Sequence, residues 1–204
     1  IKYRLMAENV APDAPLIAET GGLNAMIVDS TALPEQAVRD TVASAFQSAG
    51  QRCSALRVLY VQEDVAGKVT AMLTGAMEAL SVGDPADIAT DVGPVIDEEA
   101  RSSIAAYCQE KAGEGRLVAK LDVPGEGLFV APHILRVRGI EEMEREIFGP
   151  VLAVQVVTSD EEALAILSNL FPEREVIPVN CRELITQGGS LHCPPKDLHA
   201  RGRG

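Results

Sequence analysis

The sequence predicts an α/β fold, with an open and mostly parallel sheet that carries helices on both of its faces. Short, apolar, β-branched runs alternate along the chain with longer runs whose apolar residues recur at helical spacing. This alternation is typical of parallel strands joined by helices. Hydrophobic residues make up 47% of the 204 residues and aromatic residues only 3%. The chain can therefore bury a core, and aliphatic side chains must fill most of it.

The first part of the chain is expected to form two strands, each followed by a helix. Residues 24–29 form a short strand, after which Pro34 opens a helix that ends near Gly50. Residues 56–61 form a second strand, and a helix from about 63 to 80 follows. The inner faces of the two helices are marked by Val38, Val42, Ala45 and Phe46, and by Val65, Val69, Leu73, Met77 and Leu80.

The second part continues the alternation. Asp97 is placed to cap a helix over about 98–110, because its side chain can accept a hydrogen bond from the first turn. The Pro124-Gly125-Glu126-Gly127 loop separates two short predicted strands. The remaining elements are expected at 116–120 and 128–130 (these two strands), 151–157 (strand), 161–170 (helix) and 175–179 (strand).

Composition restricts the partners and the compartment. The net charge is −12, and no basic stripe is present, so nucleic acid is not an expected partner. No apolar run is long enough to span a bilayer, and no leading segment resembles a signal peptide. The four cysteines, Cys53, Cys108, Cys181 and Cys193, show no paired spacing, which favours a reduced, cytoplasmic setting. Because the first residue is Ile1, we expect a fragment or a missing start.

One cysteine and one glutamate stand where chemistry is expected. Cys53 follows a Gly-Gln-Arg turn at a helix-to-strand junction. A lone cysteine is more often a small buried hydrophobe, but this position and the adjacent Arg52, which would favour the thiolate, make a nucleophile the competing interpretation. Glu19 leaves an apolar run into the Gly21-Gly22 turn. A carboxylate there could activate the water that releases a thiol-bound intermediate.

These two segments closely resemble the catalytic core of the NAD(P)-dependent aldehyde dehydrogenases. The run Ala-Glu-Thr-Gly-Gly-Leu-Asn-Ala-Met-Ile-Val-Asp at 18–29 resembles the glutamate-semialdehyde (pyrroline-5-carboxylate) dehydrogenases of bifunctional proline-utilisation enzymes. The run Glu-Arg-Glu-Ile-Phe-Gly-Pro at 144–150 is a third match. A helix end followed by a Gly-Pro turn is the structural alternative for that run taken alone.

The resemblance implies a role for each matching residue and a small aldehyde as substrate. Cys53 would attack the aldehyde while its backbone N–H donates to the developing oxyanion, and Glu19 would act as general base. Glu146 would hold the nicotinamide ribose of NAD, and Phe148 would pack beside the nicotinamide. Ser54 would help to hold the carboxylate of the substrate, which implies oxidation of glutamate semialdehyde to glutamate.

The resemblance covers about residues 10–157, so we interpret residues 1–157 as an incomplete aldehyde dehydrogenase catalytic domain. The sequence contains no Gly-rich strand-to-helix turn for a dinucleotide. Association with missing parts of a larger enzyme is therefore expected, and a non-catalytic α/β remnant is the alternative.

Residues 158–204 have a different character. They resemble the end of the agmatine deiminases, which makes Cys193 a third, more distant nucleophile candidate. The Pro-Pro and Arg-Gly-Arg-Gly runs favour partial disorder from about residue 185. Ligand-type side chains also occur here without a recognised metal-binding spacing, and no metal site is predicted from them: Cys181, His192, Cys193 and His199.

Overall fold

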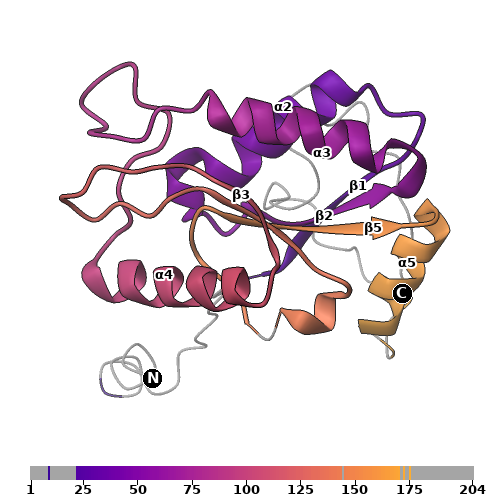
Figure 1. The fold of residues 1–204 in the computed structure, drawn as a ribbon. Helices are drawn as coiled ribbons and strands as arrows, with labels where there is room; N and C mark the ends of the chain where they lie inside the picture. Colours follow the sequence, from indigo (N-terminus) through magenta and orange to yellow (C-terminus); the bar gives the residue numbers. More distant parts are fainter. Residues whose placement is uncertain (1–8, 10–21, 144, 171, 173–174, 176–204) are drawn as a thin grey trace, which may run out of the picture.

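A five-stranded sheet forms the centre of the fold in the computed structural model, which describes residues 9, 22–143, 145–170, 172 and 175. The strands are β1 (Asn24–Val28), β2 (Leu56–Gln62), β3 (Leu117–Lys120), β4 (His133–Arg136) and β5 (Val151–Val157). Their spatial order is β1-β2-β5-β4-β3, and every neighbouring pair is parallel except β3 with β4. The predicted mostly parallel sheet is confirmed (Figure 1).

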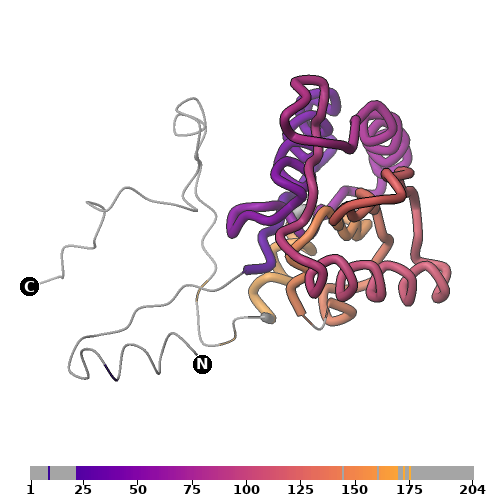
Figure 2. The backbone as a smooth tube through the Cα atoms, turned by 90° about the vertical axis from the view of Figure 1, so that its left-hand side faces the viewer, coloured from indigo at the N-terminus to yellow at the C-terminus, as the bar shows by residue number. Residues whose placement is uncertain are grey.

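Helices cover both faces of this sheet. Helices α2 (Pro34–Phe46) and α3 (Glu63–Glu78) lie together on one face, and α4 (Glu98–Gly113) and α5 (Asp160–Leu170) lie on the other. The view turned by 90° shows the same layers edge-on (Figure 2). Two short 3-10 turns, η1 (Gln47–Gly50) and η2 (Ile140–Glu142), complete the elements. The prediction of helices on both faces is confirmed.

The central strand β2 is apolar at almost every position because both of its faces are covered. Leu59 and Val61 join the cluster that contains α2 and α3. Val58 and Tyr60 join a second cluster that includes Ala163 of α5. A strand buried on both faces is expected to be a continuous apolar run rather than an alternating one.

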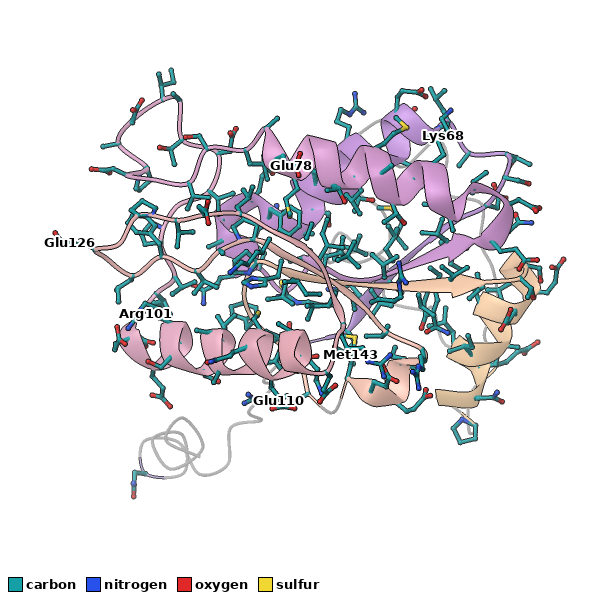
Figure 3. All side chains as sticks on the ribbon, in the orientation of Figure 1. Lys68, Glu78, Arg101, Glu110, Glu126 and Met143 are labelled. Carbon is teal, nitrogen blue, oxygen red and sulfur yellow. The ribbon has the colours of Figure 1, made fainter. Side chains whose placement is uncertain are left out.

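The predicted inner stripes of the helices are confirmed. In α3, Val69, Leu73 and Met77 are buried, and in α2 Val38, Ala45 and Phe46 are buried. The remaining stripe residues, Val42, Val65 and Leu80, are partly buried against the same core. Charged side chains such as Lys68, Glu78 and Glu126 point away from the layers, whereas Met143 packs inside (Figure 3). No helix among the described residues is long and apolar enough to cross a bilayer.

Helix α4 has a well-formed cap at each end. The Asp97 carboxylate accepts a hydrogen bond of 2.8 Å from the backbone N–H of Ala100, as predicted. At the other end, the N–H groups of Gly115 and Arg116 donate to the carbonyls of Ala112 and Lys111. Gly115 has φ +73°, which is the left-handed conformation that ends many helices.

Two predicted strands differ from the observed elements or lie outside the described residues. Residues 128–130 were expected to form a strand, and this is wrong: the strand is β4, at His133–Arg136. The Leu128 carbonyl instead accepts a bond from Val95, and Val130 is buried as part of the core. The four residues of β4 pair with β3 on one side and β5 on the other, so tertiary pairing outweighed local propensity. The strand predicted at 175–179 lies, apart from Glu175, outside the described residues.

Candidate active site

Three chain segments meet at the end of the sheet where the strands β1, β2 and β5 begin. Residues 22–24 lead into β1, residues 51–55 lead into β2, and residues 146–150 lead into β5. Hydrogen bonds join all three, and they include Gly22 N–H to Glu146 (3.1 Å) and Gln51 to the Phe148 carbonyl (3.1 Å). In most open α/β sheets the ligand site lies at the carboxyl ends of the strands. Here the candidate residues gather at the amino ends.

Cys53 lies on an exposed turn that hydrogen bonds from Asn24 hold in place. The side-chain amide of Asn24 donates to the Cys53 carbonyl (2.6 Å) and to the Ala55 carbonyl (3.0 Å). The thiol is free and exposed. Among the described residues, no hydrogen bond uses the Cys53 backbone N–H as donor. The turn therefore presents a thiol with an adjacent N–H, which are the two groups that thiol addition to a carbonyl requires.

The backbone before Cys53 is held in a strained conformation. Ser48, Ala49 and Gly50 have φ values of 56°, 51° and 64°, all in the left-handed region. Only glycine adopts that region freely, so Ser48 and Ala49 cost about 1 kcal/mol or more each. A Cβ on Gly50 would overlap the Gly149 carbonyl. The segment that leads into the Cys53 turn thus packs backbone to backbone against the Gly149-Pro150 turn.

Arg52 is bonded to the end of the preceding helix. Its Nη2 donates to the carbonyls of Ala43 (3.0 Å) and Ser44 (3.2 Å) in the last turn of α2. The guanidinium group therefore binds the negative end of the helix dipole. These bonds attach the turn that carries Cys53 to α2.

Glu146 is bound by a buried arginine. Its Oε1 accepts from Nε (3.3 Å) and Nη2 (3.2 Å) of Arg57, whose side chain is 1% exposed. Burial lowers the pKa of Arg57, and the Glu146 carboxylate opposes that shift. Removing one partner of a buried ion pair typically costs about 3–5 kcal/mol, because the other charge is left uncompensated. Glu146 is therefore fixed in position while 17% of its side chain stays exposed.

Phe148 lies beside this ion pair with 41% of its surface exposed. The Arg57 guanidinium carbon is 5.3 Å from the centroid of its ring. Gln51 accepts from the Ile96 N–H (2.9 Å) while it donates to the Phe148 carbonyl. A hollow of about 350 Å³ opens here, lined by side chains that include Gln51, Glu146 and Phe148 but not Cys53.

Sequence reasoning missed Arg57 and the holding roles of Asn24 and Gln51. The signal for Arg57 was present, since a charged residue inside the apolar run Leu56–Val61 needs a buried partner. Glu19 and Cys193 lie outside the described residues, so the prediction that Glu19 and Cys53 face one cleft stays a prediction. Ser54 is exposed, next to Cys53.

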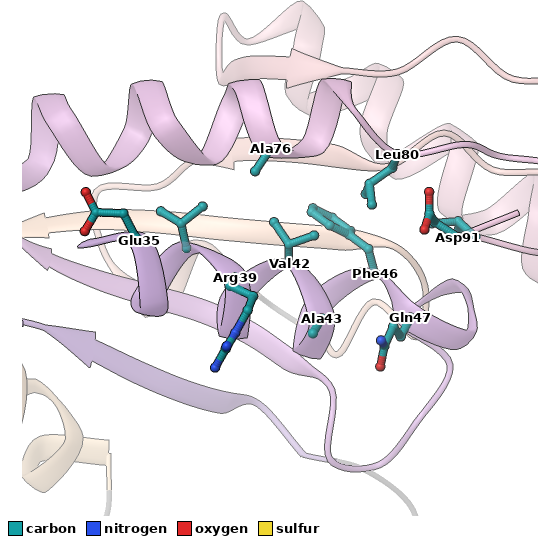
Figure 4. A pocket seen from close by; sticks show the side chains of 11 residues that line it. Glu35, Arg39, Val42, Ala43, Phe46, Gln47, Ala76, Leu80 and Asp91 are labelled. Carbon is teal, nitrogen blue, oxygen red and sulfur yellow. The ribbon is translucent and has the colours of Figure 1, made fainter. Parts of the chain in front are cut away.

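Other groups in the described part of the chain do not compete for the role of active site. Cys108 is 2% exposed, and burial raises the pKa of its thiol to about 12, so it is inert. No group of three metal-ligating side chains occurs among the described residues, and the ligand-type side chains at 181–199 lie outside them. A hollow of about 390 Å³ between α2 and α3 is mostly apolar, with Val42, Phe46 and Leu80 facing it (Figure 4).

Comparison with known proteins agrees with this geometry. The sequence pattern of the aldehyde dehydrogenase family matches residues 3–170. Because this match spans most of the 204 residues, the chain belongs to the aldehyde dehydrogenase family. A second pattern, that of Porphyromonas-type peptidyl-arginine deiminases, matches residues 146–197 and overlaps the first.

Individual relatives show which members of the family this chain is similar to. The chain is 51% identical over 148 residues to the bifunctional protein PutA of Salmonella typhimurium strain LT2, covering 69% of this chain and 11% of that protein. It is 38% identical over 157 residues to the 1-pyrroline-5-carboxylate dehydrogenase of Geobacillus kaustophilus, covering 76% and 30%. The chain thus spans about a tenth to a third of the length of these relatives.

Solved structures show the same relationship in three dimensions. A variant of proline utilization A from Bradyrhizobium japonicum superposes with a TM-score of 0.75 at 49% identity, covering 81% of this chain and 17% of that one. Betaine aldehyde dehydrogenase from Staphylococcus aureus, solved in complex with NAD+, superposes with a TM-score of 0.72 at 28% identity, covering 82% and 35%.

Proposed function

We propose that this chain supplies the nucleophile-bearing part of an NAD-dependent dehydrogenase that oxidises glutamate semialdehyde to glutamate. The observation that carries the proposal is the exposed Cys53 turn, which hydrogen bonds connect to the Glu146–Phe148 turn. The names of the relatives, PutA and 1-pyrroline-5-carboxylate dehydrogenase, support the substrate. The carboxylate of that substrate would lie near Ser54.

The chemistry begins at the sulfur of Cys53. Its thiolate adds to the aldehyde carbon, and the backbone N–H of Cys53 donates to the oxyanion that forms. Loss of hydride from that carbon leaves a thioester on Cys53. Glu19 then takes a proton from water, whose oxygen attacks the thioester and releases the acid. NAD, when bound, supplies the hydride acceptor.

The described residues fit one end of NAD. Phe148 offers an exposed aromatic ring, and Glu146 offers a partly exposed carboxylate beside it, which suit a flat nicotinamide and the hydroxyls of its ribose. No Gly-rich phosphate-binding turn occurs among the described residues. NAD is therefore proposed to need further protein, and association with the remaining parts of a larger enzyme in the cytoplasm belongs to the same proposal.

The proposed function is tested first at Cys53. The chain should hydrolyse p-nitrophenyl acetate slowly, because acylation of Cys53 needs no cofactor. Cys53→Ala should abolish the hydrolysis, and Cys108→Ala is the matched control that should preserve it. Glutamate semialdehyde should slow alkylation of Cys53 by iodoacetamide more than acetaldehyde does. Hydrolysis that survives Cys53→Ala would favour the non-catalytic alternative.

Dehydrogenase activity is a separate measurement. Positioning of reactants can account for about 7–11 kcal/mol of barrier lowering, and Glu146 and Phe148 alone would forfeit much of it. When these 204 residues are mixed with NAD and glutamate semialdehyde, we expect negligible formation of NADH. The absorbance of NADH is the measurement. Robust NADH formation would show that the chain is sufficient for the reaction.

The second candidate is a guanidine-modifying activity at Cys193, within a distinct unit at 158–204. The match to the deiminase pattern over 146–197 favours it. The acidic and histidine partners of such a cysteine were not found in the sequence. Colorimetric detection of ureido products from agmatine or peptidyl-arginine, abolished by Cys193→Ala, would establish this activity.

A further inference from the structure

Arg57 is the most completely buried charged group of the described residues, and it faces the site instead of solvent. Its guanidinium group makes contacts on three sides. Nε and Nη2 donate to Glu146, Nη1 donates to the Gly149 carbonyl (3.1 Å), and Nη2 donates to the Arg52 carbonyl (3.3 Å). Its guanidinium carbon lies over the Phe148 ring. One side chain therefore touches both the turn before Cys53 and the turn that carries Glu146 and Phe148.

A local irregularity of the sheet accompanies this arrangement. Asn24 of β1 pairs with Leu56 of β2, whereas the next residue, Ala25, pairs with Val58. Arg57 is thus the extra residue of a bulge and has no partner of its own in the β1–β2 register. Bulges re-aim a side chain and occur frequently beside active sites. The bulge frees the Arg57 side chain from the strict alternation of the strand.

We propose that Arg57 is a positioning residue that fixes the Glu146–Phe148 turn relative to the nucleophile turn at Cys53. The expected effect of Arg57 on acylation of Cys53 rests on the proposed function. The expected effect of Arg57 on the position of the two turns does not depend on any activity. A planar guanidinium group can donate to a carboxylate and to two carbonyls at fixed angles at the same time. A lysine ammonium at the same place would keep the charge and lose that geometry.

The test compares two conservative substitutions in the full chain. Arg57→Lys keeps the positive charge and removes the planar set of guanidinium donors. Arg116→Lys is the matched control, because Arg116 forms another partly buried arginine–glutamate pair, with Glu142 (2.6 Å), away from the Cys53 turn. Hydrogen–deuterium exchange is measured for peptides spanning residues 48–56 and 145–151. We expect exchange in both peptides to rise together, about tenfold, in Arg57→Lys and in neither for Arg116→Lys.

The second readout separates positioning from general loosening. Ester acylation of Cys53 needs an aligned N–H donor, whereas alkylation by iodoacetamide needs only an accessible thiol. Arg57→Lys should slow acylation about tenfold, leave alkylation of Cys53 within about twofold, and leave buried Cys108 unlabelled. Labelling of Cys108 would show that the variant had loosened the whole fold, which would overturn the proposal of a local positioning role.

The two hypotheses fail in different ways. If the wild-type chain shows no acylation dependent on Cys53, the proposed function fails, and the exchange data still decide on Arg57. If neither peptide exchanges faster in Arg57→Lys, Arg57 does not hold the two turns together. Should Arg57→Lys not fold, exchange of the wild-type chain in rising urea replaces it. The two peptides should then open with one urea dependence, and independent opening would overturn the inference.

Discussion

Gly50 is the last residue of η1, directly before the turn that carries Cys53, and replacing it by alanine should be strongly destabilising. Two separate costs add. Gly50 has φ +64°, a conformation that costs an L-residue about 1–2 kcal/mol. The new Cβ would also lie 2.5 Å from the carbonyl carbon of Gly149 and 2.8 Å from the Ala45 oxygen, which are backbone atoms that cannot rotate away. Overpacking of this kind typically costs about 1–3 kcal/mol.

The expected loss of unfolding free energy for Gly50→Ala is therefore about 2–5 kcal/mol, which corresponds to a fall in melting temperature of roughly 10 °C for a domain of this size. Two control glycines separate the causes. Gly115 has φ +73° and open space around it, so Gly115→Ala should lose only about 1–2 kcal/mol. Gly75 lies inside α3 with no neighbour within 4 Å, so Gly75→Ala should gain about 0.5–1 kcal/mol.

Urea denaturation followed by circular dichroism measures all three variants on one scale. The order of stability should be Gly75→Ala above wild type, then Gly115→Ala, then Gly50→Ala. If Gly50→Ala equals Gly115→Ala, the close approach of Gly50 to Gly149 is not a constraint, and the reasoning about the packed turns is wrong. A Cβ on Gly50 would push the turn before Cys53 away from Gly149 and from the adjacent Phe148. Gly50→Ala should therefore also slow acylation of Cys53.

Two further predictions concern the cysteines. Iodoacetamide should alkylate exposed Cys53 much faster than Cys108, which is 2% exposed, and equal labelling of both in the folded chain would count against this. Burial raises the pKa of the Cys108 thiol from 9.0 to about 12, so the unfolded chain releases this proton before the folded chain does. Stability should therefore fall as pH rises from 9 toward 12, by at most about 1.4 kcal/mol per pH unit. Urea titrations of Cys108→Ala over this pH range should show a shallower fall, and an identical slope would refute it.

Most of the layered framework was predictable because it depends on local patterns. Helix α3 was expected from its apolar stripe, and Asp97 was expected to cap α4, since both features need only residues a few positions apart. The apolar, β-branched run at 56–61 likewise indicated a strand, which is β2. The family resemblance added candidate roles for Cys53, Glu146 and Phe148, which local patterns alone did not assign.

The remaining features were decided by contacts between distant segments. Strand β4 exists because β3 and β5 lie on either side of it, whereas the more β-prone residues 128–130 lie outside the sheet. The bulge that aims Arg57 at Glu146 results from the register of β2 against β1, and no residue of β2 encodes that register alone. Sequence determined which residues could do chemistry here. Tertiary packing decided that Glu146 binds a buried arginine and that Arg52 binds a helix end, because hydrogen-bond partners far apart in sequence are chosen only when the chain has folded.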